Sequence, residues 1–232
     1  MTVLKTSKLW VILNAAGSFI KTEVDKLFDP EFVNMCDAVT VDPIQNFDAN
    51  RYFGTWFEQA HVREFEVFQP TDSVCIQAEY TPNDDGTFRV DNTYQEDKNH
   101  WFSSTSYFTD RTGITGLAKC DEGVGSCYVS FFNKAFSDKP NYTVVDTDYD
   151  SYSIVYSCQP KTQKQIVWIL SRTPELEEQT FKQTLSTIHQ KIPNFDPSHF
   201  DGVTFQGSNC TYTSGASNNA MLNLDSESNF LF

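Results

Sequence analysis

Residues 46–58 read NFDANRYFGTWFE and place Gly54 two positions before Trp56. A β-prone run, Thr55–Val62, begins inside this stretch. From about Arg51 to Ser171 the chain continues as short β-prone runs separated by clusters of turn residues, and helical periodicity is nearly absent there. This spacing predicts an antiparallel sandwich or barrel. A Gly-x-Trp sequence is uninformative by itself, so its meaning depends on the motifs that follow it.

The β-prone runs are separated by turns such as residues 82–86, where Gly, Asn and Asp tolerate the positive φ of a tight hairpin. The runs predicted as strands are Thr55–Val62, Ser73–Tyr80, Thr87–Tyr94, Trp101–Phe108, Gly113–Lys119, Cys127–Phe132, Tyr142–Asp148, Ser153–Cys158 and Gln165–Ser171.

One helix is predicted after the last run, over residues 174–192. Thr173 is the expected N-cap and Pro174 the first helical residue, with glutamates following near the positive end of the helix dipole. Pro193 ends the pattern. One apolar stripe packs this helix on another element; its residues are Phe181, Leu185, Ile188 and Ile192.

Composition limits the class of protein. The chain has 232 residues, 39% hydrophobic and 15% aromatic, which suits one folded domain and excludes a disordered chain. Its formal charge of −14 would repel a polyphosphate backbone and an anionic membrane. We therefore expect no nucleic acid partner.

The six cysteines are an even number without a CxxC pair, so a disulfide framework is favoured over a metal site, with free buried thiols as the alternative. Disulfides require an oxidising compartment, which predicts a secreted or lumenal protein; membrane association within a larger complex is the alternative. Two N-glycosylation sequons, at Asn141 and Asn209, agree with that compartment.

The two ends of the chain have their own patterns. Residues 1–20 hold Lys5 and Lys8, the apolar run Leu9–Leu13 and small residues before Gly17, which reads as a secretory signal peptide or as a retained amphipathic helix. The segment Phe205–Tyr212 is predicted as one more strand, and residues 214–232 as a poorly ordered tail.

No motif for catalysis is present. The sequence lacks HExxH, GxSxG, P-loop, GxGxxG and EF-hand patterns, and its four histidines have no metal-ligand spacing. We predict no catalytic residues, no metal site, no cofactor and no enzymatic activity.

Two further motifs follow the Gly-x-Trp sequence. Thr147-Asp148-Tyr149 lies between two predicted strands, and Trp168-Ile169-Leu170-Ser171-Arg172 ends just before the predicted helix. In this order and spacing, the three motifs resemble those of the lipocalin family over about Asn46–Tyr212. The resemblance is strongest to the apolipoprotein D and bacterial outer-membrane lipocalin branch, whose strands are similar to Cys75–Tyr80 and Ile154–Cys158.

The resemblance implies an all-β fold: an eight-stranded antiparallel up-and-down β-barrel, the lipocalin calyx, with one C-terminal α-helix packed on it. Residues 46–213 would form the barrel and helix, preceded by an N-terminal arm at 21–45. It also implies the disulfides Cys36–Cys158 and Cys75–Cys210, which leaves Cys120–Cys127 to close a hairpin. Each long-range bridge would contribute on the order of 2–5 kcal/mol.

The family motifs imply a structural cluster formed by Gly54, Trp56, Thr147, Asp148, Tyr149 and Arg172. Trp56 would plug the closed end of the barrel beneath the guanidinium of Arg172, a cation–π contact. Because arginine stays charged, we expect backbone carbonyls to accept its hydrogen bonds.

A barrel of this size holds a small ligand, and side chains that alternate along each strand line it. Trp168 and Tyr80 match positions that line the pocket in apolipoprotein D. Strand alternation adds Glu58, Ala60, Ile76, Ala78, Ile166 and Leu170, and aromatic runs add Tyr107, Phe131 and Tyr142. A single β-bulge would reverse this alternation beyond it.

Three functions are consistent with the sequence. The first is binding and transport or sequestration of a small hydrophobic ligand such as a lipid, fatty acid, retinoid, steroid or pigment. The second is a structural accessory subunit of a larger assembly, with protein partners bound by the N-terminal arm and the C-terminal tail and a calyx filled by its own side chains. The third is an enzyme, which requires a free cysteine or a buried acid–base pair inside the calyx.

Overall fold

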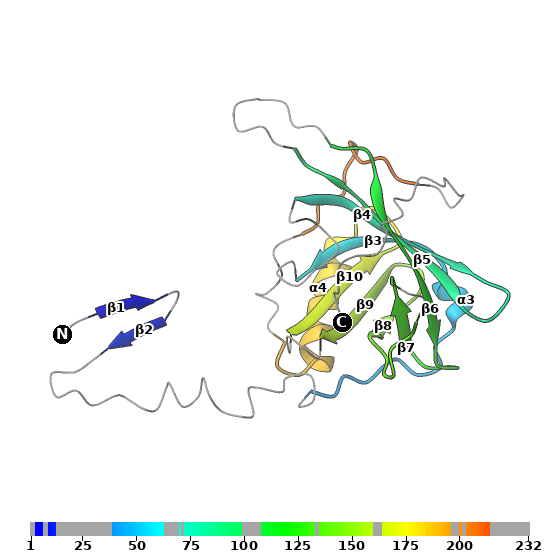
Figure 1. The fold of residues 1–232 in the computed structure, drawn as a ribbon, viewed down its shortest axis with the longest axis horizontal. Helices are drawn as coiled ribbons and strands as arrows, with labels where there is room; N and C mark the ends of the chain where they lie inside the picture. The colour runs from blue at the N-terminus through cyan, green and yellow to red at the C-terminus, as the bar shows by residue number, and fades with distance from the viewer. Residues whose placement is uncertain are drawn as a thin grey trace.

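The structure is a computed structural model (Figure 1). It describes residues 39–62, 70, 72–98, 108–132, 135–159, 164–195, 200 and 203–213, together with the backbone of 3–6 and 9–12.

A closed antiparallel β-barrel forms the body of the protein, in the strand order β10-β3-β4-β5-β6-β7-β8-β9. Each strand pairs with the next along the chain and β10 pairs back with β3, which confirms the predicted up-and-down barrel. Of the predicted run Trp101–Phe108 only Phe108 is described, in an isolated bridge with Asp97. The strands are β3 (Gly54–His61), β4 (Ser73–Pro82), β5 (Phe88–Glu96), β6 (Thr112–Cys120), β7 (Ser126–Ser130), β8 (Tyr142–Thr147), β9 (Tyr152–Gln159) and β10 (Lys164–Ser171).

Alternation along the strands divides the buried side chains into an inner and an outer core. On β10, Leu170 belongs to a cluster inside the barrel with Trp168 packed against it, whereas Val167 and Ile169 belong to a second cluster outside. The outer cluster includes Ile188 of helix α4 (Glu178–Lys191), which lies along the barrel beside β9 and β10 (Figure 1). The predicted C-terminal helix is therefore present and packs on the barrel.

The helix begins later than predicted. The expected span was 174–192 with Thr173 as N-cap, but α4 starts at Glu178 and no side chain caps it. The side chain of Gln59 holds the preceding segment in a non-helical conformation: its Nε2 donates to the Pro174 carbonyl at 3.0 Å and its Oε1 accepts from the Leu176 amide at 3.2 Å. These long-range hydrogen bonds outweigh the local helix-start pattern.

The described part of residues 1–20 forms two strands and no helix, and the rest of that segment lies outside the described residues. Strands β1 (Val3–Thr6) and β2 (Leu9–Ile12) pair antiparallel, from Val3 opposite Ile12 to Thr6 opposite Leu9. The β-branched and aromatic residues here favour an extended backbone over a helix. Among the described residues, no helix is long and apolar enough to cross a membrane.

The closed end of the barrel is built around Trp56, whose side chain is fully buried. The Arg172 guanidinium carbon lies 3.7 Å from the centroid of the Trp56 ring. Arg172 donates to the carbonyls of Arg51, Thr55 and Tyr149 at 2.7–2.9 Å. Burial lowers the pKa of Arg172, and these acceptors offset the cost of desolvating its charge.

The backbone beside the Arg172 guanidinium requires a glycine at position 54. Its φ is +93°, a backbone conformation that residues other than glycine rarely adopt. A Cβ placed there would lie 3.6 Å from Arg172 Nη1. The short helix α3 (Ala49–Tyr52) leads into this turn and is capped by Asp48, whose side chain accepts from the Asn50 amide.

The turn between β8 and β9 is organised by Asp148. Its Oδ1 accepts from the amides of Asp150, Ser151 and Tyr152 at 3.1, 2.8 and 3.0 Å, and its Oδ2 accepts from the Ser151 hydroxyl. Burial alone would raise the pKa of Asp148, but these hydrogen bonds to the carboxylate outweigh it and lower the pKa.

We expect this carboxylate to make stability depend on pH. A lowered pKa in the folded state means that the stabilisation is fully present above the unfolded-state pKa, about 4, and is lost as the pH falls through the folded-state value. Asp148→Asn should therefore cost on the order of 1 kcal/mol at neutral pH and progressively less in acid, since the carboxylate is partly exposed. Urea denaturation over a pH series measures both trends. The exposed Asp84→Asn is the control, and a pH-independent cost at Asp148 would contradict the prediction.

Candidate functional site: the interior of the barrel

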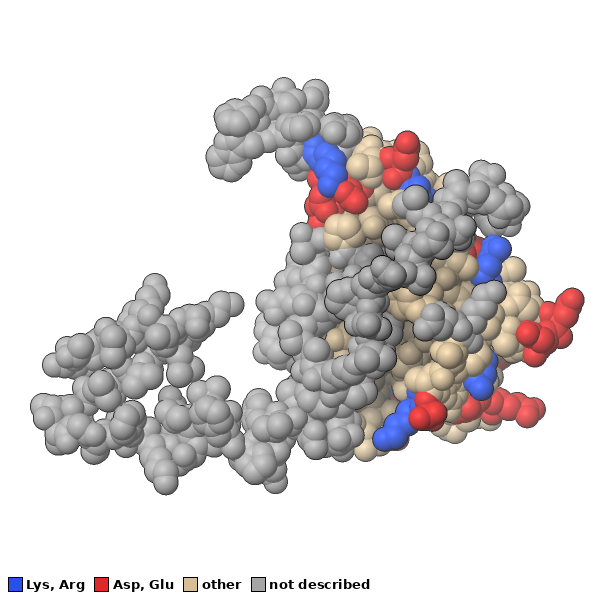
Figure 2. Space-filling view, in the orientation of Figure 1, with Lys and Arg blue, Asp and Glu red and all other residues tan. Residues whose placement is uncertain are grey.

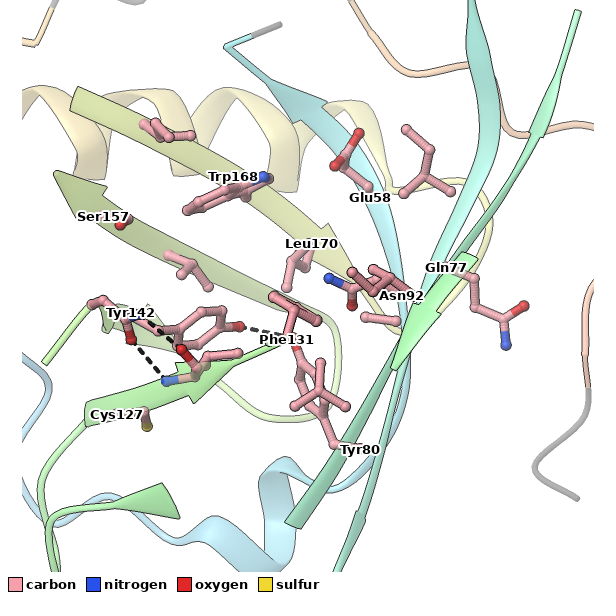
Figure 3. A pocket seen from close by; sticks show the side chains of 18 of the residues that line it. Glu58, Gln77, Tyr80, Asn92, Cys127, Phe131, Tyr142, Ser157, Trp168 and Leu170 are labelled. Carbon is pink, nitrogen blue, oxygen red and sulfur yellow. Dashed lines mark hydrogen bonds between the residues drawn. The ribbon is translucent and has the colours of Figure 1, made fainter. Parts of the chain in front are cut away.

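The barrel encloses a cavity of about 170 Å³ (Figure 3). Most of its lining is apolar or aromatic. The predicted residues that line it are Glu58, Ile76, Ala78, Tyr80, Phe131, Tyr142, Ile166, Trp168 and Leu170. Tyr107, also predicted, lies outside the described residues.

Ala60 does not line the cavity, contrary to the prediction. Opposite β10, Leu170 pairs with Glu58 and Ile169 pairs with Ala60, so Gln59 is an extra residue on β3. This β-bulge reverses the alternation beyond it. Ala60 therefore packs in the outer core, and His61 takes the inward position opposite Trp168.

Lining residues on five strands were not predicted, among them Gln77 on β4. Those on β5 alternate strictly and could have been found from the same period-2 pattern that was applied to β4. The missed residues include Phe88, Val90, Asn92 and Tyr94 on β5, Ile114 on β6, Val129 on β7 and Val155 on β9.

A chain of hydroxyl groups crosses the closed end of the cavity. Tyr52 lies 2.8 Å from Ser153 Oγ and 3.1 Å from the Tyr142 hydroxyl, which lies 2.9 Å from that of Tyr80. Burial raises the pKa of Tyr52 to about 12 and raises those of Tyr80 and Tyr142 as well, so the chain is neutral at physiological pH. Four hydroxyls share three hydrogen bonds, so one O–H is not used within the chain. Three of the four hydroxyls, those of Tyr52, Tyr80 and Tyr142, belong to residues that line the cavity.

A buried polar cluster lies closer to the other end. Glu58 Oε1 is 2.6 Å from His61 Nδ1 and accepts from the Thr204 hydroxyl at 2.8 Å. The side chains of Glu58 and His61 are 4% and 3% exposed, so the pair is withdrawn from bulk water. Glu58 and His61 therefore form a buried acid–base pair, one of the two features that an enzymatic calyx would require. The other feature is a free cysteine, and no cysteine among the described residues is free.

The C-terminal segment Val203–Thr213 completes the barrel wall where β3 and β4 separate. The two strands pair only from Gly54 to Phe57. Beyond that point the Thr204 amide donates to the Gln59 carbonyl and the Cys75 amide donates to the Phe205 carbonyl, both at 2.8 Å. The predicted strand over Phe205–Tyr212 is not a regular strand, because the segment bonds to β3 and β4 at separate points.

One side chain joins the two strand edges. Gln206 Nε2 donates to the Glu58 carbonyl at 2.9 Å and to the Ile76 carbonyl at 2.8 Å. Gln206→Ala should lower the free energy of unfolding by about 1–3 kcal/mol, because two buried carbonyls lose their donor. It should also speed hydrogen exchange of the Thr204 and Cys75 amides. Gln190→Ala, on the exposed face of α4, is the control; equal effects of the two variants would contradict this role.

Disulfides tie these elements together. Cys75–Cys210 joins the C-terminal segment to β4 with 5.5 Å between the Cα atoms, and Cys120–Cys127 closes the β6–β7 hairpin. Cys158 is also disulfide-bonded; its predicted partner Cys36 lies outside the described residues.

The two sequons differ in their surroundings. Asn141 lines the cavity, and its amide exchanges hydrogen bonds of 2.7 and 2.8 Å with both backbone groups of Val129. Asn209 is exposed. Only Asn209 therefore presents its amide freely to solvent.

The described charges pair with one another at several places. On the face in Figure 2, basic side chains lie beside acidic ones. Among the described ion pairs, Lys98 Nζ is 2.8 Å from Asp72 Oδ2 and also contacts Glu96. Within the described ranges, no group of three or more His, Cys, Asp or Glu side chains is placed to hold a metal ion.

A closed eight-stranded barrel with a plugged end, an apolar interior and one outer helix defines a calyx-type binding protein. A family model described as a lipocalin-like domain matches residues 47–203. The outer membrane lipoprotein Blc of Escherichia coli (strain K12) is 31% identical over 174 residues, 74% of this chain and 85% of that protein. Apolipoprotein D of Macaca fascicularis is 33% identical over 147 residues, 61% of this chain and 69% of that protein.

Among solved structures, insecticyanin from the tobacco hornworm Manduca sexta has a TM-score of 0.56 at 23% identity, covering 75% of this chain and 89% of that one. This likeness concerns the fold. The chain belongs to the lipocalin family, whose members bind small hydrophobic ligands.

Proposed function

We propose that this protein binds a small hydrophobic ligand in its calyx and transports or sequesters it, without catalysis. The observation that carries the proposal is the cavity, which is lined mainly by apolar and aromatic side chains from strands around the barrel. Burying about ten methylene groups there would contribute roughly 8 kcal/mol before ordering costs, which corresponds to micromolar binding at best.

The proposed location is a secretory lumen or the exterior of the cell envelope. The two described bridges support an oxidising compartment. We infer that any N-linked glycan attaches at Asn209, because the Asn141 amide is bonded within the barrel.

Native mass spectrometry with lipid extraction, on protein purified from its source, tests the proposal. A lipophile released on denaturation is the expected result. An empty barrel that copurifies with other chains in fixed ratio would contradict it and favour the accessory-subunit function.

A further inference from the structure

The described lining of the calyx contains an acidic side chain but no Lys or Arg side chain. Among the described residues that line it, Glu58 is the one carboxylate, and none is Lys or Arg. Figure 3 shows the Glu58 side chain on the same side of the cavity as Trp168 and Leu170, away from Tyr142. Within this described lining, a ligand therefore meets an acidic group and no Lys or Arg side chain, and the nearby imidazole of His61 is already in contact with that acid.

The protonation state of His61 decides whether the Glu58–His61 pair is anionic or neutral. If the imidazole is neutral, Glu58 carries an uncompensated charge in an apolar surrounding, a state that a cation would stabilise. If it is an imidazolium, the pair is neutral overall. In neither state does the site present a net positive charge to an anion.

The carboxylate retains capacity to accept. Among the described residues, Thr204 and His61 both approach Oε1, and Oε2 retains capacity to accept from a donor. A hydrogen bond between a carboxylate and a charged donor is stronger than one between neutral groups. The tyrosine hydroxyls at the closed end are neutral, so they do not supply a positive charge to balance the charge of an anionic ligand.

We propose that Glu58 selects the polar end of the ligand: the calyx prefers a lipophile that ends in a protonated amine, accepts one that ends in a hydroxyl, and disfavours one that ends in a carboxylate. This inference rests on the proposed function and narrows it. Among the candidate ligands, it ranks fatty-acid anions last.

Three probes with the same chain test the preference: decylamine, decanol and decanoate, titrated by isothermal calorimetry near neutral pH. The expected order of affinity is decylamine, decanol, decanoate. Glu58→Gln keeps the size of the side chain and removes its charge, so the ratio of decylamine to decanoate affinity should fall by roughly ten- to one hundredfold.

Glu79→Gln is the matched control. Glu79 lies on the opposite face of β4, where it accepts from Thr55, and its substitution changes the net charge of the protein equally. An unchanged affinity ratio in Glu79→Gln separates the local effect from general attraction of cations to an acidic protein.

The order of the three affinities in the wild-type protein tests the proposed preference even if Glu58→Gln fails to fold. Decanoate binding as tightly as decylamine would overturn the inference. Decanol binding with no advantage for decylamine would overturn it too, while leaving the proposed function in place. Failure of all three probes would contradict the proposed function and the inference together.

Discussion

Replacing Trp56 by alanine is expected to lower the free energy of unfolding by roughly 3–5 kcal/mol, the range for a large aromatic side chain removed from a core. The indole is fully buried, its centroid lies 5.1 Å from that of Tyr52, and its Nε1 donates to the Tyr52 carbonyl at 2.9 Å. The variant also removes the ring beneath the Arg172 guanidinium. Urea denaturation followed by far-ultraviolet circular dichroism measures the loss.

Trp168→Ala is the matched control, because it removes an equal side chain from the cavity side of the same barrel. Trp168 is only half-buried and faces space that is already open, so its removal should cost less than half as much. Equal losses for the two variants would show that Trp56 has no special part in the closed end.

Filling the cavity should abolish ligand binding while the barrel stays folded. Ala78 lies on β4 with its side chain on the cavity, opposite Trp56 on β3 and Asn92 on β5. An indole at this position is large relative to a cavity of about 170 Å³. Ala78→Trp should therefore reduce affinity for a neutral lipophile such as decanol by at least about tenfold and cost about 1–3 kcal/mol of stability.

Thr81→Trp is the control for this variant. It adds the same indole to the same strand at an exposed position, and it should leave the affinity unchanged. Undiminished decanol binding by a folded Ala78→Trp variant would place the ligand outside the calyx.

The barrel could be predicted because its determinants are local. Alternating strands, turn residues and the motifs at Gly54, Thr147 and Arg172 all agree on one topology, and each of the eight barrel strands overlaps its predicted run. The same alternation placed Ala78 and Tyr80 on the cavity, because no irregularity interrupts β4 after Gln77. Ile76, which lies within the irregularity between Val74 and Gln77, also lines the cavity as predicted.

The errors have long-range causes. The bulge at Gln59 moved Ala60 outward and His61 inward, and nothing in the local sequence marks it. The side chain of the same glutamine hydrogen-bonds to the backbone of Pro174 and Leu176, so α4 begins at a later residue than predicted. Thr204, which contacts Glu58, is distant in sequence from it. Contacts of this kind form only when the chain is folded, so period and propensity could not identify the polar cluster.

A crystal structure of the protein isolated from its source, with any co-purified molecule retained, tests the central claim most directly. We expect continuous density for one elongated molecule inside the barrel, in contact with Trp168 and Tyr80. A calyx closed by its own side chains, or a ligand bound only on the outer surface, would contradict it.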